Sequence, residues 1–288
     1  MIAFLAPMSL LTTAVLLAMA AGQRGPPFDP SRWRLDMLDE FDGNSLNTSL
    51  WTAKTGIHTS QEGEWYLPEN VAVHGGRLTL TAKVSADPRK TGGLNYTSGW
   101  VDSKDNWAAL GGRFEASCGF FIGAGGRSRG LWPAYWLMPQ GGSCWPVSGE
   151  IDVMESLGGC HTGGMKTCGE QESHWDLHYS KTGACNNDGS IGNFTKPIPL
   201  SRHGNLFNES LSTFGVNYDV PGDQMTFYVN ETVVGVHSGF NELVDKLHPW
   251  YHILNYAVGG PWGGFPDAET VFPTRMECDW VRHFSPQG

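Results

Sequence analysis

Three carboxylates stand close together in the segment SGEIDVMESLGG, residues 148–159: Glu150, Asp152 and Glu155. The residues between them are apolar and of strand-forming type. Neighbouring anions disfavour one another's ionised form, so this crowding raises the pKa of at least one carboxyl. A carboxyl that keeps its proton, beside one that stays ionised, is the pair that general acid–base and nucleophilic chemistry needs.

The spacing of the three carboxylates raises a geometric question. On a regular strand Glu150 and Asp152 share one face, and Glu155 points to the other. A β-bulge adds one residue and would return Glu155 to the face of the other two. The bulged span would be roughly 13 Å, at about 3.3 Å per residue. Two glutamates leaning inward would shorten it to the ~5 Å used by retaining glycosidases. A solvated edge strand with no chemistry is the alternative.

Aromatic residues surround the carboxylate segment. Trp132, Tyr135, Trp136 and Trp145 lie just upstream, and the chain has 12 Trp in all. Aromatic faces pack against the apolar faces of sugar rings, and an indole N–H also reaches a hydroxyl. Core packing explains most of the 12, so the aromatic residues near the carboxylates favour a sugar ligand without proving one.

Short strands with turns between them account for most of the remaining pattern. Segments of strand character occupy residues 77–84, 111–121, 132–139, 149–156, 212–220, 224–237, 250–260 and 275–284. The Pro-Gly-Asp triplet at 221–223 is a turn signal, and 38 Gly suit many tight turns. Residues 157–210, rich in Gly and Asn, are interpreted as long loops on one rim. The pattern predicts an all-β sandwich or barrel.

Composition limits the classes of ligand. The net charge of -10 argues against nucleic acid, which is bound through Lys and Arg. It argues less strongly against anionic polysaccharides, so a neutral ligand is favoured. The cysteine spacing contains no C-x-x-C pair, which disfavours a zinc site.

The first 22 residues are uncharged and apolar and end in Ala18-Met19-Ala20, typical of a signal-peptide cleavage site. A membrane anchor is the alternative, because the usual positive residues are missing. Cleavage would leave residues 23–288 as one domain, secreted to the extracellular space. Six cysteines suit an oxidising compartment, with 15 pairings open. Five N-x-S/T sequons begin at Asn47, Asn95, Asn193, Asn208 and Asn230.

Ordered motifs along residues 23–288 resemble glycoside hydrolase family 16, in its bulged E-x-D-x-x-E branch of laminarinase-type endo-β-1,3-glucanases. DEFDGNSLNTSLWT (39–52) is similar to the opening strand of the family, and PENVAVHGGRLTLTA (68–82) to the stretch that follows. YTSGWVDSKDNWAALGGRFEAS (96–117) looks like the next strand pair. GLWPAYWLMP and GEIDVMES match the core signature, and LNYAVGGPWGG and CDWVRHF the closing strands. The order and spacing of these motifs together make the resemblance specific.

The resemblance implies a concanavalin-like β-jelly-roll sandwich of two curved antiparallel sheets with an open concave cleft. It implies that Glu150 is the nucleophile, Glu155 the general acid/base, and Asp152 the residue that tunes their protonation. The substrate-binding residues that it implies are Trp132, Trp136, His178, Trp262, Asn70 and Arg113. The implied reaction is retaining endohydrolysis of β-1,3-glucan, with transglycosylation if a sugar acceptor replaces water.

The family often carries a structural calcium ion, whose ligands here would be the backbone oxygens of Glu40 and Gly76 and the carboxylate of Asp279. No cofactor is expected to enter the chemistry. The expected partner is the polysaccharide substrate, with no nucleic acid, no membrane after signal cleavage, and a monomeric chain. The Cys-rich segment 160–185 departs from the bacterial pattern and puts the number of sugar subsites and the linkage in doubt.

Two other functional classes stay open. One is a non-catalytic β-glucan recognition protein, which is expected to lack one or both glutamates. The other is an enzyme on a different polysaccharide: agarose, carrageenan or mixed-linkage glucan. An enzyme that binds sulfated carrageenan is expected to have a basic site, whereas this chain is acidic. Mixed-linkage specialists of the family usually have the unbulged E-x-D-x-E.

Overall fold

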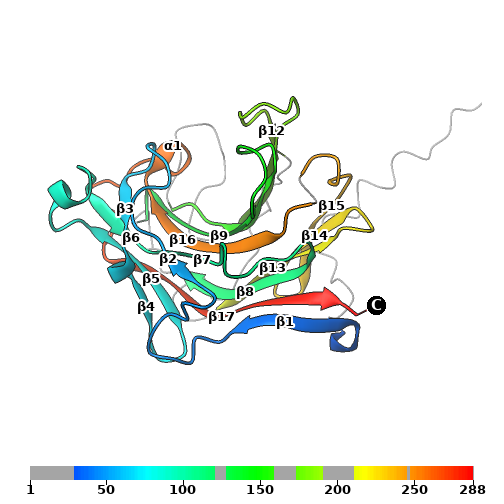
Figure 1. The fold of residues 1–288 in the computed structure, drawn as a ribbon. Helices are drawn as coiled ribbons and strands as arrows, with labels where there is room; N and C mark the ends of the chain where they lie inside the picture. The colour runs from blue at the N-terminus through cyan, green and yellow to red at the C-terminus, as the bar shows by residue number, and fades with distance from the viewer. Residues whose placement is uncertain (1–28, 121–127, 159–172, 191–210, 245–246, 288) are drawn as a thin grey trace, which may run out of the picture.

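Two stacked β-sheets form the fold, as the predicted sandwich requires (Figure 1). The computed structural model describes residues 29–120, 128–158, 173–190, 211–244 and 247–287. The smaller sheet has seven strands in the order β12-β11-β10-β9-β16-β7-β2. Their bounds are β2 (Thr52–Ala53), β7 (Trp100–Asp102), β9 (Leu131–Pro139), β10 (Glu150–Glu155), β11 (His174–Tyr179), β12 (Gly189–Ser190) and β16 (Trp250–Val258).

The larger sheet has ten strands, with the order β15-β14-β13-β8-β17-β5-β6-β3 and with β1 and β4 paired to β17 and β5. Its strands are β1 (Trp33–Asp39), β3 (Glu64–Tyr66), β4 (Val71–Val73), β5 (Leu78–Val84), β6 (Tyr96–Ser98), β8 (Gly112–Phe120), β13 (Ser212–Asp219), β14 (Gln224–Val229), β15 (Thr232–Ser238) and β17 (Thr274–Pro286). Pairing is antiparallel except between β3 and β6, which are parallel. The helical pieces are η2 (Pro30–Arg32), η3 (Pro68–Asn70), η4 (Pro88–Lys90) and α1 (Gly260–Gly263).

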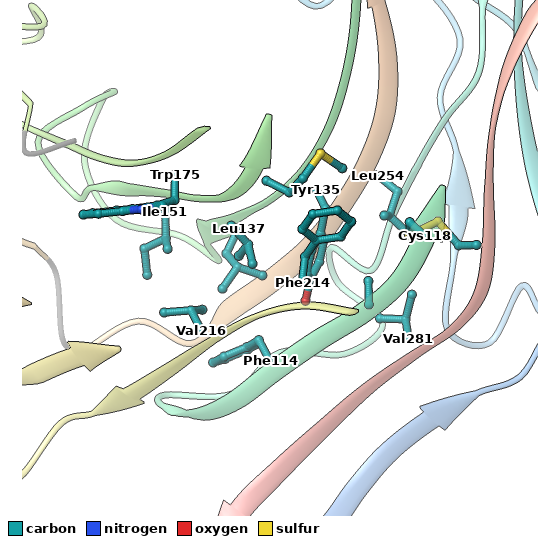
Figure 2. Close-up of a cluster of buried hydrophobic side chains, with 14 of the residues drawn as sticks. Phe114, Cys118, Tyr135, Leu137, Ile151, Trp175, Phe214, Val216, Leu254 and Val281 are labelled. Atoms are coloured by element: carbon teal, nitrogen blue, oxygen red, sulfur yellow. A yellow bond between two sulfur atoms is a disulfide. The ribbon is translucent and has the colours of Figure 1, made fainter. Parts of the chain in front are cut away.

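A core of alternating apolar side chains joins the two sheets. Tyr135, Leu137 and Ile151 point from the smaller sheet toward Phe114 and Phe214 of the larger one, and all five are fully buried (Figure 2). Burial of apolar surface at about 25 cal/mol per Å² is the main term that holds such sheets together. Because strand side chains alternate, the same strands turn their other residues to the opposite, outer face of the smaller sheet.

The predicted loops at 157–210 need a correction. Within the described part of that segment, His174–Tyr179 forms β11 and Gly189–Ser190 forms β12, both in the smaller sheet. The sequence HWDLHY alternates polar and apolar residues, which is the pattern of a strand with one buried face.

Some expectations fall outside the described residues: the signal peptide, Cys160 and Cys168, and the sequons at Asn193 and Asn208. The sequon residues Asn47, Asn95 and Asn230 are exposed. No helix among the described residues is long and apolar enough to cross a membrane.

Candidate active site

A cleft of about 740 Å³ lies over the outer face of the smaller sheet. Figure 1 shows this sheet curving upward, with β12 on one rim and α1 on the other. The residues that line the cleft are His58, Thr59, Gln61, Trp132, Met138, Trp145, Glu150, Glu155, His174, Trp175, Asp176, His178, Asn187, Ser190 and Trp262. Both predicted catalytic glutamates are in this set.

Strand β10 carries the predicted bulge. Asp152 pairs with Trp136 of β9, and Met154 pairs with the next residue of β9, Tyr135, so Val153 is the extra residue. The register against β11 shifts in the same interval. Ile151 and Val153 point into the core, and Glu150, Asp152 and Glu155 meet on the cleft side. The geometric prediction is therefore confirmed.

Glu155 lies where its carboxyl is favoured to hold a proton. It is 7% exposed, and the indole Nε1 of Trp132 donates to its Oε1 at 3.0 Å. Burial, followed by the charge of Glu150, raises the pKa of Glu155 to about 8, although the Trp132 hydrogen bond acts in the opposite direction. At neutral pH this glutamate is mostly protonated.

Glu150 has more support for its ionised form. Burial raises the pKa of Glu150 above its usual range, and His178 and the hydrogen bond from Trp145 offset part of this rise. The indole Nε1 of Trp145 donates to its Oε2 at 2.8 Å, and the Nε2 of His178 lies 3.9 Å from its Oε1. Two glutamates on one strand thus have different surroundings, which is how an enzyme separates an acid from a nucleophile.

Asp152 lies between the two glutamates and is 3% exposed. Burial and then the charges of Glu155 and Glu150 raise its pKa well above the usual range, so it tends to keep its proton. Its Oδ2 has no hydrogen-bond partner within the described residues but lies 3.3 Å from the Nε2 of His178. The charge of Glu150 therefore disfavours ionisation of Asp152 and Glu155, and His178 lies beside both Glu150 and Asp152.

Strand β11 contributes the buried Trp175 and three polar side chains to the cleft lining, and the three polar residues pair with the carboxylates of β10. His178 pairs with Glu150, Asp176 with Asp152, and His174 with Glu155. The sequence reasoning named only His178 of this set. Because strand residues two apart share a face, Asp176 and His174 could have been found from the position of His178.

Two of the predicted aromatic residues line the cleft. Trp132 comes from β9 and Trp262 from α1, and their ring centroids are 5.1 Å apart in an edge-to-face arrangement. Together with Trp145 they provide indole surfaces on both sides of the glutamates. Such surfaces suit the apolar faces of sugar rings.

Trp136 and Asn70 are more deeply buried than expected. Trp136 is 7% exposed, beneath His58 and against Trp100, and its Nε1 donates to Asn255. Asn70 ends η3 and is 2% exposed. Neither is among the described residues that line the cleft.

Arg113 does not lie at the cleft, so that expectation is wrong. It belongs to β8 of the larger sheet, where its guanidinium pairs with Glu115 and Glu231 and lies 4.1 Å over the ring of Tyr228. The motif match placed the strand correctly but did not show which layer the side chain faces.

His58 lines the cleft and was missed by the sequence reasoning. It packs against Trp100 and Trp136, and burial lowers its pKa to about 4, so its imidazole is neutral. No local pattern marked it, because it lies in a stretch between strands whose position depends on tertiary packing.

The proposed calcium ligands occupy three different segments. Glu40 is exposed after β1, Gly76 is in the turn between β4 and β5, and Asp279 is at the register shift in β17. They would supply three oxygens, whereas calcium takes about six to eight, so further ligands would be needed. Calcium binding stays a prediction.

Comparisons with known proteins find relatives whose names refer to β-glucans. Residues 23–144 match a family described as beta-glucan synthesis-associated protein SKN1/KRE6/Sbg1. Glucan endo-1,3-beta-glucosidase A1 of Niallia circulans is 26% identical over 91% of this chain, which spans 40% of that protein. The beta-glucanase of Rhodothermus marinus is 28% identical, over 94% of this chain and 93% of the relative.

Solved structures share the fold as well. The catalytic domain of an endo-1,3-beta-glucanase (laminarinase) from Thermotoga petrophila superposes with a TM-score of 0.71 at 28% identity. The match covers 89% of this chain and 99% of that domain.

Proposed function

The chain belongs to glycoside hydrolase family 16, and on that premise we propose that it is an endo-acting, retaining glycosidase that cleaves β-1,3-glucan chains. The observation that carries the proposal is the bulge in β10. It brings Glu150 and Glu155 to one face of an open cleft, each with its own indole donor. The names of the Niallia and Thermotoga relatives support the β-1,3 linkage.

The first step uses the two glutamates in different protonation states. Glu155 gives its proton to the leaving glycosidic oxygen while Glu150 attacks the anomeric carbon. The C–O bond of the substrate breaks, and a glycosyl ester of Glu150 forms. The Nε2 of His178 lies 3.9 Å from the nucleophile Glu150 and 3.3 Å from Asp152.

The second step releases the product. Glu155, now ionised, takes a proton from water, and the resulting nucleophile attacks the anomeric carbon of the ester. Glu150 leaves as a carboxylate, and the configuration of the sugar is retained. The chain is proposed to act outside the cell, as a monomer, on a neutral polysaccharide.

Transfer to a sugar acceptor is the second candidate function. It shares the glycosyl-enzyme intermediate and differs only in what attacks it. The match of residues 23–144 to a family described as beta-glucan synthesis-associated favours this alternative. Products longer than the starting oligosaccharide would identify transfer, and shorter products alone would identify hydrolysis.

The first test measures reducing-sugar release from laminarin, barley mixed-linkage glucan, agarose and κ-carrageenan. Wild type is compared with Glu150→Gln and with Glu242→Gln, which removes a charge from an exposed residue outside the cleft lining. We expect laminarin activity in wild type and Glu242→Gln, and a loss of at least about 10³-fold in Glu150→Gln. Activity only on a galactan would overturn the substrate. Laminarin binding without hydrolysis of any glycan would point to a recognition protein.

A further inference from the structure

Asp176 is a fourth carboxylate in the cleft that the mechanism above does not use. It lies in the middle of β11, directly opposite Asp152 of β10. Its side chain is 24% exposed and lines the cleft. The position is set by the strand register, because β11 turns Trp175 and Leu177 into the core and Asp176 outward.

The two oxygens of Asp176 have separate contacts. Oδ1 accepts a hydrogen bond from the backbone N–H of Leu177 at 2.7 Å, which fixes the orientation of the carboxylate. Oδ2 then lies 3.6 Å from the Nε2 of His178. That nitrogen is also 3.3 Å from Asp152 and 3.9 Å from Glu150.

One imidazole nitrogen thus faces three carboxylates. The other ring nitrogen, Nδ1, lies 3.2–3.4 Å from the side-chain amide of Asn187. Asn187 therefore restrains the edge of the ring opposite to Nε2. Asp176 is the member of this set that lies on the same strand as His178. Its carboxylate therefore restrains the imidazole from β11 itself, at the nitrogen that also faces β10.

Asp176 also acts through its charge. The titratable groups around it come from β10, from its own strand and from β15: Glu150, Asp152, Glu155, His174, His178 and His237. The negative charge of Asp176 disfavours ionisation of all three carboxyls of β10.

We propose that Asp176 is a positioning residue of this glycosidase, which holds His178 beside the nucleophile and keeps the proton on Glu155 as the pH rises. The inference rests on the proposed function and adds to it the carboxylate residue of β11. It acts through Glu155 and His178 and does not need to touch the reacting atoms.

The test is the pH profile of kcat/KM on laminarin oligosaccharides for wild type and Asp176→Asn. The amide keeps the shape and the Leu177 contact but removes the charge. We expect the alkaline limb to move down by about 0.5 to 1 pH unit, because Glu155 loses one neighbouring anion. Activity at pH 8 should then fall about threefold relative to activity at pH 6.

Asp176→Glu keeps the charge and should keep the alkaline limb near that of wild type, whereas Asp176→Ser, a second charge-free variant, should shift it as Asp176→Asn does. Glu242→Gln removes one charge elsewhere and should leave the profile unchanged. Thermal unfolding of each variant checks the fold.

An active Asp176→Asn or Asp176→Ser enzyme with an unshifted alkaline limb would overturn the inference and leave the proposed function standing. The same shift in Glu242→Gln would also overturn it. Failure of both charge-free variants to fold would assign Asp176 a structural role and overturn it too. A wild type without hydrolysis would overturn the proposed function first, and this inference with it.

Discussion

At the scale of single residues, the acid/base Glu155 is subject to opposing influences. Burial and the charge of Glu150 raise its pKa, and the hydrogen bond from Trp132 lowers it. The result, about 8, sets the pH above which the first chemical step loses its proton donor. The activity of the wild-type enzyme should therefore decline above about pH 8.

Replacing Trp132 by Phe tests this balance. Trp132→Phe keeps an aromatic ring but removes the Nε1 donor, which favours the ionised form of Glu155. The pKa of Glu155 then rises, so the alkaline limb of kcat moves up, opposite to the shift expected for Asp176→Asn. A profile of kcat against pH at saturating laminarin measures it, because loss of substrate contact appears in KM. A limb that moves down would contradict the assignment of Glu155 as the acid.

The geometry of these residues could largely be predicted from the sequence, whereas their catalytic roles came from the family resemblance and stay predictions. The parity of Glu150 and Asp152, together with a bulge before Glu155, was enough to place the three carboxylates on one face. Asp176 followed from the same parity rule but was overlooked. His58 could not be predicted, since only tertiary packing brings it to the cleft.

At the scale of elements, β3 is tied to the end of β16 by a buried pair of carboxyls. Glu62, two residues before the start of β3 at Glu64, is 9% exposed, and Glu64 is 1% exposed. Glu64 accepts the backbone N–H of Val258 at 2.9 Å. Glu62 Oε2 and Glu64 Oε1 have no hydrogen-bond partner among the described residues, so we expect the two carboxyls to share one proton. The link holds the base of α1, which carries Trp262.

Glu62→Gln tests the shared proton. Burial, and then Glu64, raises the pKa of Glu62 from 4.5 to about 10. Because the pKa of Glu62 is higher in the folded state than in the unfolded state, its contribution to the free energy of unfolding is largest below about pH 4.5. This contribution is lost progressively as the pH rises toward 10. The amide donates without titrating, so the variant should gain stability relative to wild type between pH 5 and 9.

Urea unfolding of wild type, Glu62→Gln and Glu242→Gln at pH 5, 7 and 9 measures the effect. Parallel curves for wild type and Glu62→Gln would show that Glu62 titrates normally.

Strand prediction succeeded where one face is buried and the alternation is regular. Leu78, Leu80 and Ala82 of β5 all enter the core at every second residue. Strand β11 shows the same alternation but was hidden within a segment rich in Gly and Asn. Arg113 shows the limit of motif matching, because a correct strand does not reveal which layer its side chains meet.

At the scale of the whole molecule, two disulfides among the described residues stabilise different parts. Cys118 and Cys278 are directly paired residues of β8 and β17, 1% and 0% exposed; Cys118 appears in the core in Figure 2. Cys144 and Cys185 are exposed and join the loop that carries Trp145 to the loop after β11. The separations of 160 and 41 residues correspond to about 5 and 4 kcal/mol in the chain-entropy treatment.

Exposure should decide which disulfide opens first. A thiol reductant reaches Cys144–Cys185 before Cys118–Cys278, because exchange requires access to a sulfur atom. We expect mild reduction to leave the sandwich folded but to raise KM for laminarin severalfold, since the Trp145 loop loses its anchor beside Glu150. Differential alkylation with mass spectrometry identifies the opened bond, and kinetics follow in the same samples.

The Cys144→Ser/Cys185→Ser double variant should show the raised KM without reductant. Reduction of Cys118–Cys278 at the same reductant concentration, or an unchanged KM after selective opening, would contradict this division between a core disulfide and a cleft disulfide.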